Sequence, residues 1–137
     1  MARWYFDACR KAMVAGLVGT GVLVGPVAAQ EGNAEEGAEV FKKCRACHLV
    51  GDTAKNAVGP ALNRIIGRKA GIAEGYTYSE NLRELGQGGL VWNEEQLGRY
   101  LENPKAVVPK GKMAFPGIPD AQDRADVIAY LKTFTKP

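Results

Sequence analysis

The chain has 137 residues, with 18 lysines and arginines against 15 aspartates and glutamates, one histidine and three cysteines. This length predicts a single domain. The formal net charge of +3 is too small for the strongly basic surface of a nucleic-acid-binding protein, which argues against that class.

The first 29 residues have the pattern of a secretory signal peptide. Arg3, Arg10 and Lys11 are basic, residues 12–25 are apolar, and residues 26–29 resemble a cleavage site. We therefore expect residues 1–29 to be removed on export to the periplasm, leaving residues 30–137 as the functional domain. The apolar run is shorter than the ~20 residues that span a membrane, so stable membrane insertion is not expected. A retained anchor stays open as an alternative, because the run could extend to residue 29.

The first helix of that domain is predicted to begin after Asn33, which can cap it. Acidic residues then fall in its first turn and Lys42 and Lys43 in its last, as the helix dipole favours. Gly37 lies inside this helix, where a glycine costs ~1 kcal/mol relative to alanine. We expect Gly37 to allow a close approach by the last helix of the chain.

Cys44, Cys47 and His48 form a Cys-x-x-Cys-His motif directly after this helix. The spacing is typical of covalent c-type haem attachment. Residues three apart at a helix end project from the same side, so both sulfurs can form thioethers to one porphyrin and His48 can bind its iron. Two alternatives are a thioredoxin-type redox pair, which expects a βαβ pattern that the sequence lacks, and half of a zinc site, which needs about four ligands.

The segment after His48 is predicted to be a loop over residues 49–59, followed by a short helix that Gly59 and Pro60 open and that ends near Gly67. Pro60 has no N–H of its own, so its carbonyl is available to accept a hydrogen bond from an imidazole. A haem histidine normally has such an acceptor. The competing interpretation of Pro60 is a simple loop-to-helix boundary.

Three more helices are predicted in the C-terminal half. The first begins after a Ser79 cap and ends at Gly86, and the second begins after an Asn93 cap and ends at Asn103-Pro104. The third begins after an Asp120 cap and has an apolar stripe formed by Val127, Ile128, Leu131 and Phe134. Residues 104–119 are rich in proline, so no regular element is expected there. No strand pattern is found. The predicted fold class is therefore all-α, with about four or five short helices around one covalently bound haem.

Met113 lies in that proline-rich segment and is the only methionine after residue 29. Its place outside any helical stripe argues against a gap-filling role in a core.

The charges are separated along the chain. Segments 42–69 and 99–116 carry 11 basic and two acidic residues, whereas the rest of residues 30–137 carries four basic and 12 acidic residues. This separation predicts a dipolar molecule whose basic end lies near the proposed haem ligands. It indicates steering toward an acidic protein partner, with scattered solubilising lysines as the alternative.

Six motifs, taken in order, resemble the class I cytochromes c, and are especially similar to mitochondrial cytochrome c and the bacterial cytochromes c2. They are CRACH at 44–48, VGP at 58–60, GYTY at 75–78, YLENP at 100–104, KMAF at 112–115 and IAYLK at 128–132. The resemblance runs from about Gly32 to Lys136.

The resemblance implies one haem c attached to Cys44 and Cys47, with His48 and Met113 as the two axial iron ligands. Pro60 would accept the hydrogen bond of the His48 N–H. The remaining implied cofactor-binding residues are three that face a haem propionate and one aromatic residue close to the methionine: Arg68, Tyr78 and Trp92, and then Tyr100. One departure is Gly111, which stands where many relatives have a threonine, so a hydrogen bond to a propionate is expected to be absent.

The resemblance also implies a monomeric electron carrier and not an enzyme. It would take electrons from a cytochrome bc1-type complex to a terminal oxidase or a photosynthetic reaction centre. Docking would use a basic face formed by five lysines at the rim of the haem: Lys43, Lys55, Lys105, Lys110 and Lys112. The rival hypothesis is a haem peroxidase or the acceptor domain of a dehydrogenase; peroxidase chemistry needs an open iron position, which His and Met ligands together would close.

Overall fold

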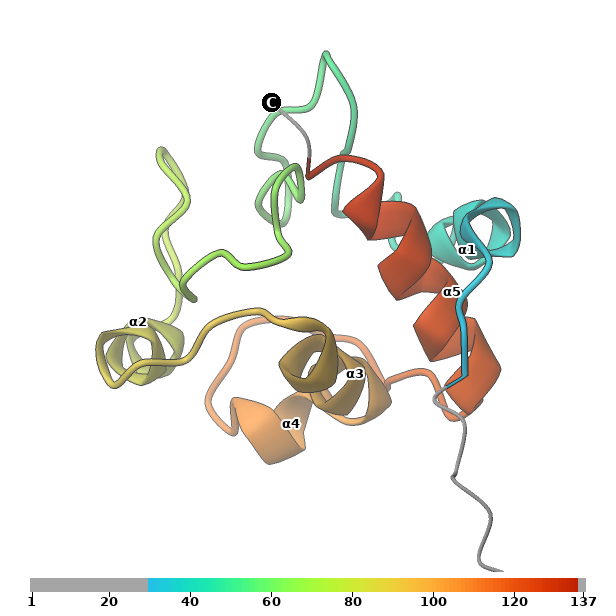
Figure 1. Cartoon of the computed structure of the whole chain (residues 1–137). Coiled ribbons are helices and arrows are strands. Elements are labelled where there is room, and N and C mark those ends of the chain that lie inside the picture. The colour runs from blue at the N-terminus through green and yellow to red at the C-terminus, as the bar shows by residue number, and fades with distance from the viewer. Residues whose placement is uncertain (1–29, 136–137) are drawn as a thin grey trace, which may run out of the picture.

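The computed structural model describes residues 30–135, and the predicted signal peptide lies outside them. Its helices are α1 (Ala34–Phe41), α2 (Glu80–Gln87), α3 (Glu94–Glu102), α4 (Pro104–Val107) and α5 (Ala121–Lys132) (Figure 1). The described residues contain no β-strand. The β-type pairing among them is one isolated antiparallel bridge between Lys69 and Val91. The predicted all-α fold class is confirmed. None of the helices in residues 30–135 is long and apolar enough to cross a membrane.

Each helix begins after a residue whose side chain accepts a hydrogen bond from a backbone N–H of the first turn. These caps are Asn33, Ser79, Asn93, Asn103 and Asp120. Such caps satisfy N–H groups that have no partner inside the helix, and each typically contributes about 1 kcal/mol. The helix starts are therefore set by local chemistry.

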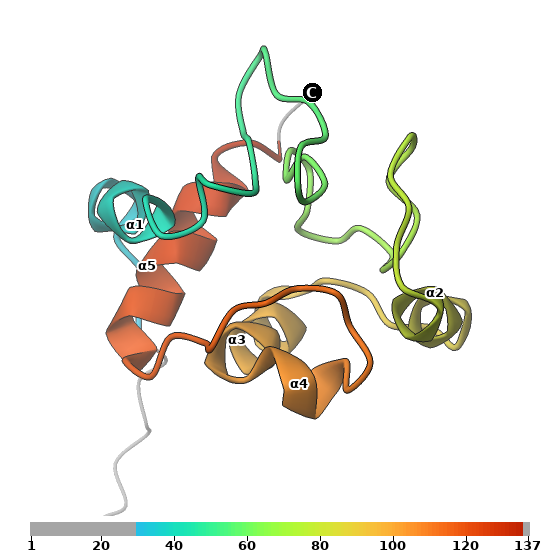
Figure 2. The ribbon, with the colours of Figure 1, turned by 180° about the vertical axis from the view of Figure 1, so that it is seen from behind.

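Helices α1 and α5 pack against each other and form one side of the molecule (Figures 1 and 2). Their close approach depends on Gly37, because a Cβ there would overlap the carbonyl oxygen of Asp126 and lie 2.8 Å from Cβ of Tyr130. The predicted role of Gly37 is confirmed. Phe41 of α1 and Val127 of α5, each 1% exposed, belong to the same hydrophobic core.

The remaining helices and loops surround a central space. Helix α3 contacts both α4 and α5, whereas α2 lies away from them on the far side of the molecule (Figure 2). The loops that follow α1 form the opposite edge from α3 and α4 in both views (Figures 1 and 2). Residues from α1, α2, α3, α5 and the loops line a cavity inside this arrangement.

The predicted helix from Gly59 to Gly67 is wrong, because this segment forms turns. Asn63 bonds through its side chain to the backbone of Gly51, and the Arg64 N–H donates to the carbonyl of Phe134. Arg64 itself has φ of +56°, the left-handed region, which no helix residue adopts. Long-range bonds therefore override the local helix signal.

The predicted ends of two helices also differ from the structure. Helix α1 ends at Phe41, and Lys42 and Lys43 follow it in tighter turns with i to i+3 bonds, so they do not lie in its last turn. Gly86 does not end α2; it lies inside the helix, where a Cβ would overlap the carbonyl oxygen of Ala70, and Gly88 is the residue after the helix.

Two further differences lie in the C-terminal third. Residues 104–119 were expected to lack regular structure, but Asn103 caps the one-turn helix α4 and Pro104 occupies its first position, where the missing N–H costs nothing. Helix α5 ends at Lys132, so Phe134 lies beyond it, while the other three members of the predicted stripe are buried.

Candidate functional site

The Cys-x-x-Cys-His motif forms a single helical turn. The N–H groups of Cys47 and His48 both donate to the carbonyl of Cys44, over 3.0 and 2.9 Å. Both cysteine side chains are partly buried and line the same cavity. Burial raises the pKa of the Cys44 thiol, although the neighbouring Lys43 acts in the opposite direction. The turn therefore presents two thiols and one imidazole to one space.

His48 is oriented by Pro60. Its Nδ1 lies 2.8 Å from the carbonyl oxygen of Pro60, which can only accept, so Nδ1 carries the hydrogen and Nε2 keeps its lone pair. Burial lowers the pKa of His48; the bond to Pro60 opposes this shift and the charge of Arg68 adds to it. The ring is thus held as a neutral imidazole with one nitrogen available to bind a metal.

Gly59 also positions this ring, and sequence reasoning gave it no such role. A Cβ at Gly59 would overlap Cε1 of His48 and lie 2.7 Å from Nδ1. The Gly59 N–H donates to the carbonyl of Cys47 over 2.8 Å, which fixes its backbone against the imidazole. The signal available in the sequence was the glycine next to Pro60, but its purpose depends on a ring that is 11 positions earlier.

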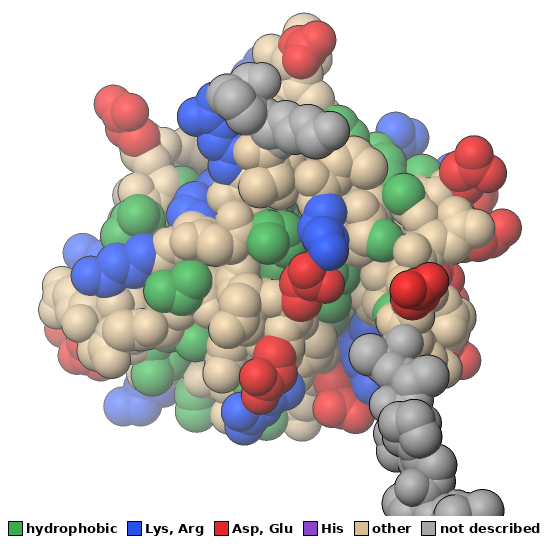
Figure 3. Space-filling view, viewed as in Figure 1, with side chains coloured by type: hydrophobic (Ala, Val, Ile, Leu, Met, Phe, Trp, Pro, Cys, Tyr) green, Lys and Arg blue, Asp and Glu red, His purple; other side chains and the backbone are tan. Residues whose placement is uncertain are grey.

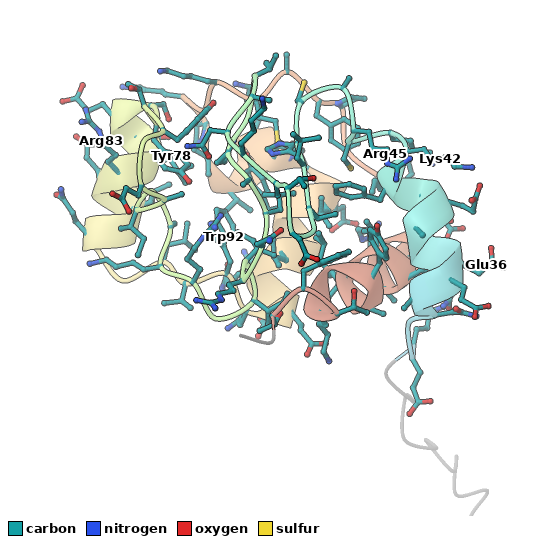
Figure 4. The ribbon with its side chains drawn as sticks, turned by 90° about the horizontal axis from the view of Figure 1, so that it is seen from above. Glu36, Lys42, Arg45, Tyr78, Arg83 and Trp92 are labelled. Carbon is teal, nitrogen blue, oxygen red and sulfur yellow. The ribbon has the colours of Figure 1, made fainter. Side chains whose placement is uncertain are left out.

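The cavity at the centre of the fold has a volume of about 600 Å³. This lies within the range of about 300–1,000 Å³ typical of small-molecule and cofactor sites. Its walls come from segments far apart in the sequence: Figure 4 shows Tyr78 beside α2 and Trp92 in the middle of the molecule, and the turn from Cys44 to His48 adds a third segment. All nine predicted site residues line it, namely Cys44, Cys47, His48, Pro60, Arg68, Tyr78, Trp92, Tyr100 and Met113.

Met113 reaches the cavity from the loop after α4. The Tyr100 hydroxyl donates to its sulfur over 3.6 Å, and the Tyr100 ring packs on Trp92 with ring centroids 4.9 Å apart. Burial, and to a smaller degree the nearby Tyr76, raises the pKa of Tyr100 to about 12. Tyr100 therefore stays protonated over the ordinary pH range and remains a donor.

Arg68 brings a positive charge to the cavity wall. Its guanidinium donates to two neutral carbonyls, those of Ala61 and Asn63, each over 3.2 Å, and no carboxylate pairs with it among residues 30–135. Burial lowers the pKa of Arg68 and raises that of the neighbouring Tyr78 phenol. A partly buried guanidinium beside a phenol suits a ligand that carries carboxylates, as haem does through its propionates.

The donors around the cavity therefore fit a covalently attached haem. Two thiols stand where thioethers would form, an imidazole nitrogen and a thioether sulfur are available to an iron, and Arg68 offers a partner for carboxylates. Residues 30–135 contain no group of three or more His, Cys, Asp or Glu residues arranged to hold a metal ion. The fold and this donor set define a c-type haem protein of all-α architecture.

Comparisons with known proteins agree. The family model for cytochrome c matches residues 34–135. The chain is 47% identical over 123 residues to a cytochrome c2 of Rhodomicrobium vannielii, covering 90% of this chain and 96% of that protein. It is 54% identical over 99 residues to a cytochrome c-550 of Ancylobacter novellus, covering 72% and 92%. The structure of cytochrome c2 from Rhodospirillum centenum superimposes with a TM-score of 0.73 at 44% identity, covering 77% of this chain and all of that one.

The chain belongs to the cytochrome c family, and its fold is that of the class I cytochromes c. Members of this family bind one covalently attached haem c, and Cys44 and Cys47 occupy the attachment positions. They are electron carriers that work with other redox proteins, and not enzymes. The predicted family, cofactor and non-enzymatic class are confirmed.

Proposed function

We propose that the chain is a periplasmic one-electron carrier, which takes electrons from a cytochrome bc1-type complex to a terminal oxidase or a photosynthetic reaction centre. The main support is the cavity, which is lined by the turn from Cys44 to His48 and, from a distant part of the chain, by Met113. Similarity to the cytochrome c2 of Rhodomicrobium vannielii supports a bacterial carrier of this kind. Residues 1–29 would be the signal peptide and residues 30–137 the carrier domain.

We propose that His48 and Met113 would bind the haem iron, which would supply the one-electron chemistry when bound. Pro60 keeps the Nδ1 hydrogen of His48 engaged, so that the lone pair of Nε2 would be available to bind the iron. Tyr100 donates to the Met113 sulfur and holds the thioether in place. Thioether ligation favours the reduced form relative to a second histidine, and two protein ligands leave no open position for oxygen or peroxide.

The other cavity residues are proposed to bind the haem carboxylates and exclude water. Arg68, Tyr78 and Trp92 present a guanidinium, a phenol and an indole N–H, all of which donate hydrogen bonds. Burying a group that gains a positive charge on oxidation is costly, so a dry cavity also favours the reduced form. The chain thereby supplies both orientation and a suitable electrostatic environment.

Docking is proposed to use the basic face, defined as Lys43, Lys55, Lys105, Lys110 and Lys112. All five are exposed, and Lys43 and Lys112 also line the cavity. Acidic side chains gather elsewhere, notably over α1 at the right of Figure 3. An acidic partner would be drawn to the basic face and released readily, because exposed charge pairs are weak and screened by salt.

The absorption spectrum of the oxidised holoprotein tests the ligand assignment. We expect the near-infrared band of a methionine sulfur bound to ferric iron, its loss in Met113→Ala, and its retention in Tyr100→Phe, which keeps the sulfur. A high-spin spectrum of the unmodified protein at neutral pH would contradict the assignment.

Two further measurements test the proposed docking surface and the proposed export. Reduction by an isolated bc1-type complex should slow as ionic strength rises, and a rate independent of salt would contradict docking through the basic face. Mass spectrometry of the native protein should find Gln30 as its first residue, whereas a start near Met1 would indicate a retained anchor.

A further inference from the structure

A second pocket lies beside the turn from Cys44 to His48 and is separate from the central cavity. Its volume is about 360 Å³, toward the lower end of the range of about 300–1,000 Å³ typical of small-molecule sites. It is lined by the last residue of α1, two residues of the turn, the two residues that follow it and one residue of α5: Phe41, Arg45, His48, Leu49, Val50 and Tyr130. We call it the Arg45 pocket.

Aromatic and aliphatic side chains form much of this pocket. Phe41 is 1% exposed, and its ring centroid lies 5.4 Å from that of Tyr130, which is only partly buried. Phe134 supports Tyr130 from another direction, with centroids 5.1 Å apart in a T-shaped pair. Leu49 and Val50 are partly buried and add aliphatic surface. Because aromatic rings pack favourably on one another at these separations, the pocket favours a flat aromatic ligand.

The polar side of the pocket is a cation without an acidic partner. Three cations occur in residues 42–45, just beyond α1. Lys42 pairs with Glu39 and Lys43 pairs with Asp123, whereas no carboxylate among residues 30–135 pairs with Arg45. Figure 4 shows Arg45 beyond the end of α1, and its side chain is exposed. The guanidinium is therefore available to a ligand.

The charge of this cation selects the class of ligand. A guanidinium is planar and binds a carboxylate through two parallel hydrogen bonds, which fixes the orientation of the carboxylate as well as its position. None of the six lining residues is acidic, so no side chain of the pocket competes with a bound carboxylate for Arg45. Ring surfaces on one side and an unpaired guanidinium on the other together match a molecule that has an aromatic ring and a carboxylate.

We propose that the Arg45 pocket binds a small aromatic carboxylate, with its ring against Phe41 and Tyr130 and its carboxylate on the guanidinium of Arg45. None of the five lysines of the basic face lines this pocket, so binding here does not depend on the proposed docking of redox partners. His48 lines both the Arg45 pocket and the central cavity. A bound ligand would therefore lie close to the ring that is proposed to bind the iron.

Titration of the reduced holoprotein with 2-naphthoate at low salt, followed by NMR, tests the proposal. The reporters are the backbone N–H groups of Leu49 and Val50, and the reference is the Gly88 N–H, which bonds to Glu84 at the end of α2. Two comparison ligands are 2-naphthalenemethanol, which keeps the rings without the charge, and acetate, which keeps the charge without the rings. We expect saturable shifts at the reporters alone, and binding of 2-naphthoate about tenfold tighter than that of either comparison ligand.

Matched variants separate the pocket from the overall charge. Arg45→Gln should weaken binding of 2-naphthoate about tenfold, to the level of 2-naphthalenemethanol. The control Arg83→Gln removes the same charge from an exposed position on α2, at the opposite end of the molecule in Figure 4, and should bind as the unmodified protein does. Tyr130→Leu keeps an apolar side chain but removes the ring, and should weaken binding about threefold. An unchanged Gly88 signal shows that each variant keeps its fold there.

Several results would overturn the proposal. No saturable shift at Leu49 and Val50 would show that the pocket binds no such ligand. Equal affinities of Arg45→Gln and Arg83→Gln for 2-naphthoate would show that the ligand responds to net charge and not to this guanidinium. Equal binding of 2-naphthoate and 2-naphthalenemethanol would refute the choice of a carboxylate, and equal binding of 2-naphthoate and acetate would refute the choice of an aromatic ligand. None of these results would bear on the proposed electron carrier.

Discussion

The loop after His48 forms one edge of the molecule, and the loop around Met113 runs along α3 and α4 (Figures 1 and 2). Both line one cavity, yet they are fastened by different chemistry. Residues 49–63 are held by neutral side chains. Asn63 forms two bonds of 2.9 Å with the peptide groups of Gly51, and Asn56 bonds to both the N–H of Ala61 and the carbonyl of Glu74. These amides do not titrate, and the two bonds to Gly51 are partly buried.

The loop around Met113 has fewer and more exposed fastenings. Its far end is secured, since the Ile118 N–H donates to Leu101 over 2.7 Å and Arg124 donates to the carbonyl of Ile118 over 2.7 Å. Closer to Met113, the ammonium groups of Lys105 and Lys112 donate to the carbonyls of Gly111 and Thr77. The Lys110 N–H donates to the side chain of Asn81, and all three bonds are exposed. The histidine side is thus built to stay fixed, while the methionine side is held by groups that solvent and partners can reach.

Gly59→Ala, on the histidine side of the cavity, should cause the largest loss of stability. The new Cβ would overlap the His48 ring, and forced overpacking of this kind costs about 3 kcal/mol of unfolding free energy. Denaturant unfolding of the holoprotein measures it. Gly98→Ala is the control, because a Cβ there meets its nearest atom at 3.9 Å, and the helix should gain about 1 kcal/mol. Equal stability of the two variants would contradict the proposed steric role.

Asn63→Ala and Asn81→Ala compare the same substitution on the two sides. Asn63→Ala removes two partly buried bonds and should cost about 2 kcal/mol, whereas Asn81→Ala removes one exposed bond and should cost about 0.5 kcal/mol. Both losses of unfolding free energy can be measured from the shift in the denaturant midpoint, provided that the dependence of the free energy on denaturant concentration is unchanged. A larger loss for Asn81→Ala would reverse the comparison between the two loops.

Tyr100→Phe should change the pH dependence of stability on the methionine side. The pKa of Tyr100 is raised from an ordinary 10.0 to about 12, so between these values the folded protein keeps a proton that the unfolded chain releases. The stabilisation is therefore complete below pH 10 and is lost as the pH rises to about 12, a change on the order of 1–2 kcal/mol. Unfolding measured at several pH values should show this decline in the unmodified protein and in Tyr76→Phe. In Tyr100→Phe the curve should be flatter, and an unchanged slope would contradict the assignment.

Arg64→Gly should strengthen the histidine side by a small amount. Arg64 adopts φ of +56°, a region that costs a non-glycine residue about 1 kcal/mol, although glycine also loses more entropy on folding. We expect a net gain of about 0.5 kcal/mol in thermal or denaturant unfolding. A loss of stability would show that the Arg64 side chain makes a contribution larger than the backbone strain.

The features that could be predicted are those whose partners lie close in the sequence. Asn33, Asn93 and Asp120 cap their helices as expected, because each bonds to an N–H two or three residues away. The turn from Cys44 to His48 is equally local. For Met113 and Tyr100, the prediction came from resemblance to a family and not from the local pattern.

The features that failed, or that were missed, depend on contacts across the fold. Gly86 resembles a helix end in the sequence, yet it is inside α2 because Ala70 approaches it. Lys43, Lys105 and Lys112 looked like equivalent free charges, but one pairs with Asp123 and two bond to loop carbonyls. No local pattern distinguishes such a lysine from one that faces only water.

By itself, the sequence determined the starts of α1, α2, α3 and α5, the attachment motif and the all-α class, because these follow from hydrogen bonds and spacings within about one helical turn. The tertiary structure alone decided that residues 59–67 form turns, that Gly59 backs the imidazole, and which lysines hold the methionine loop. Each of these depends on an atom that folding brings from a distant part of the chain, and the energy of such a contact outweighs a local preference of about 1 kcal/mol or less.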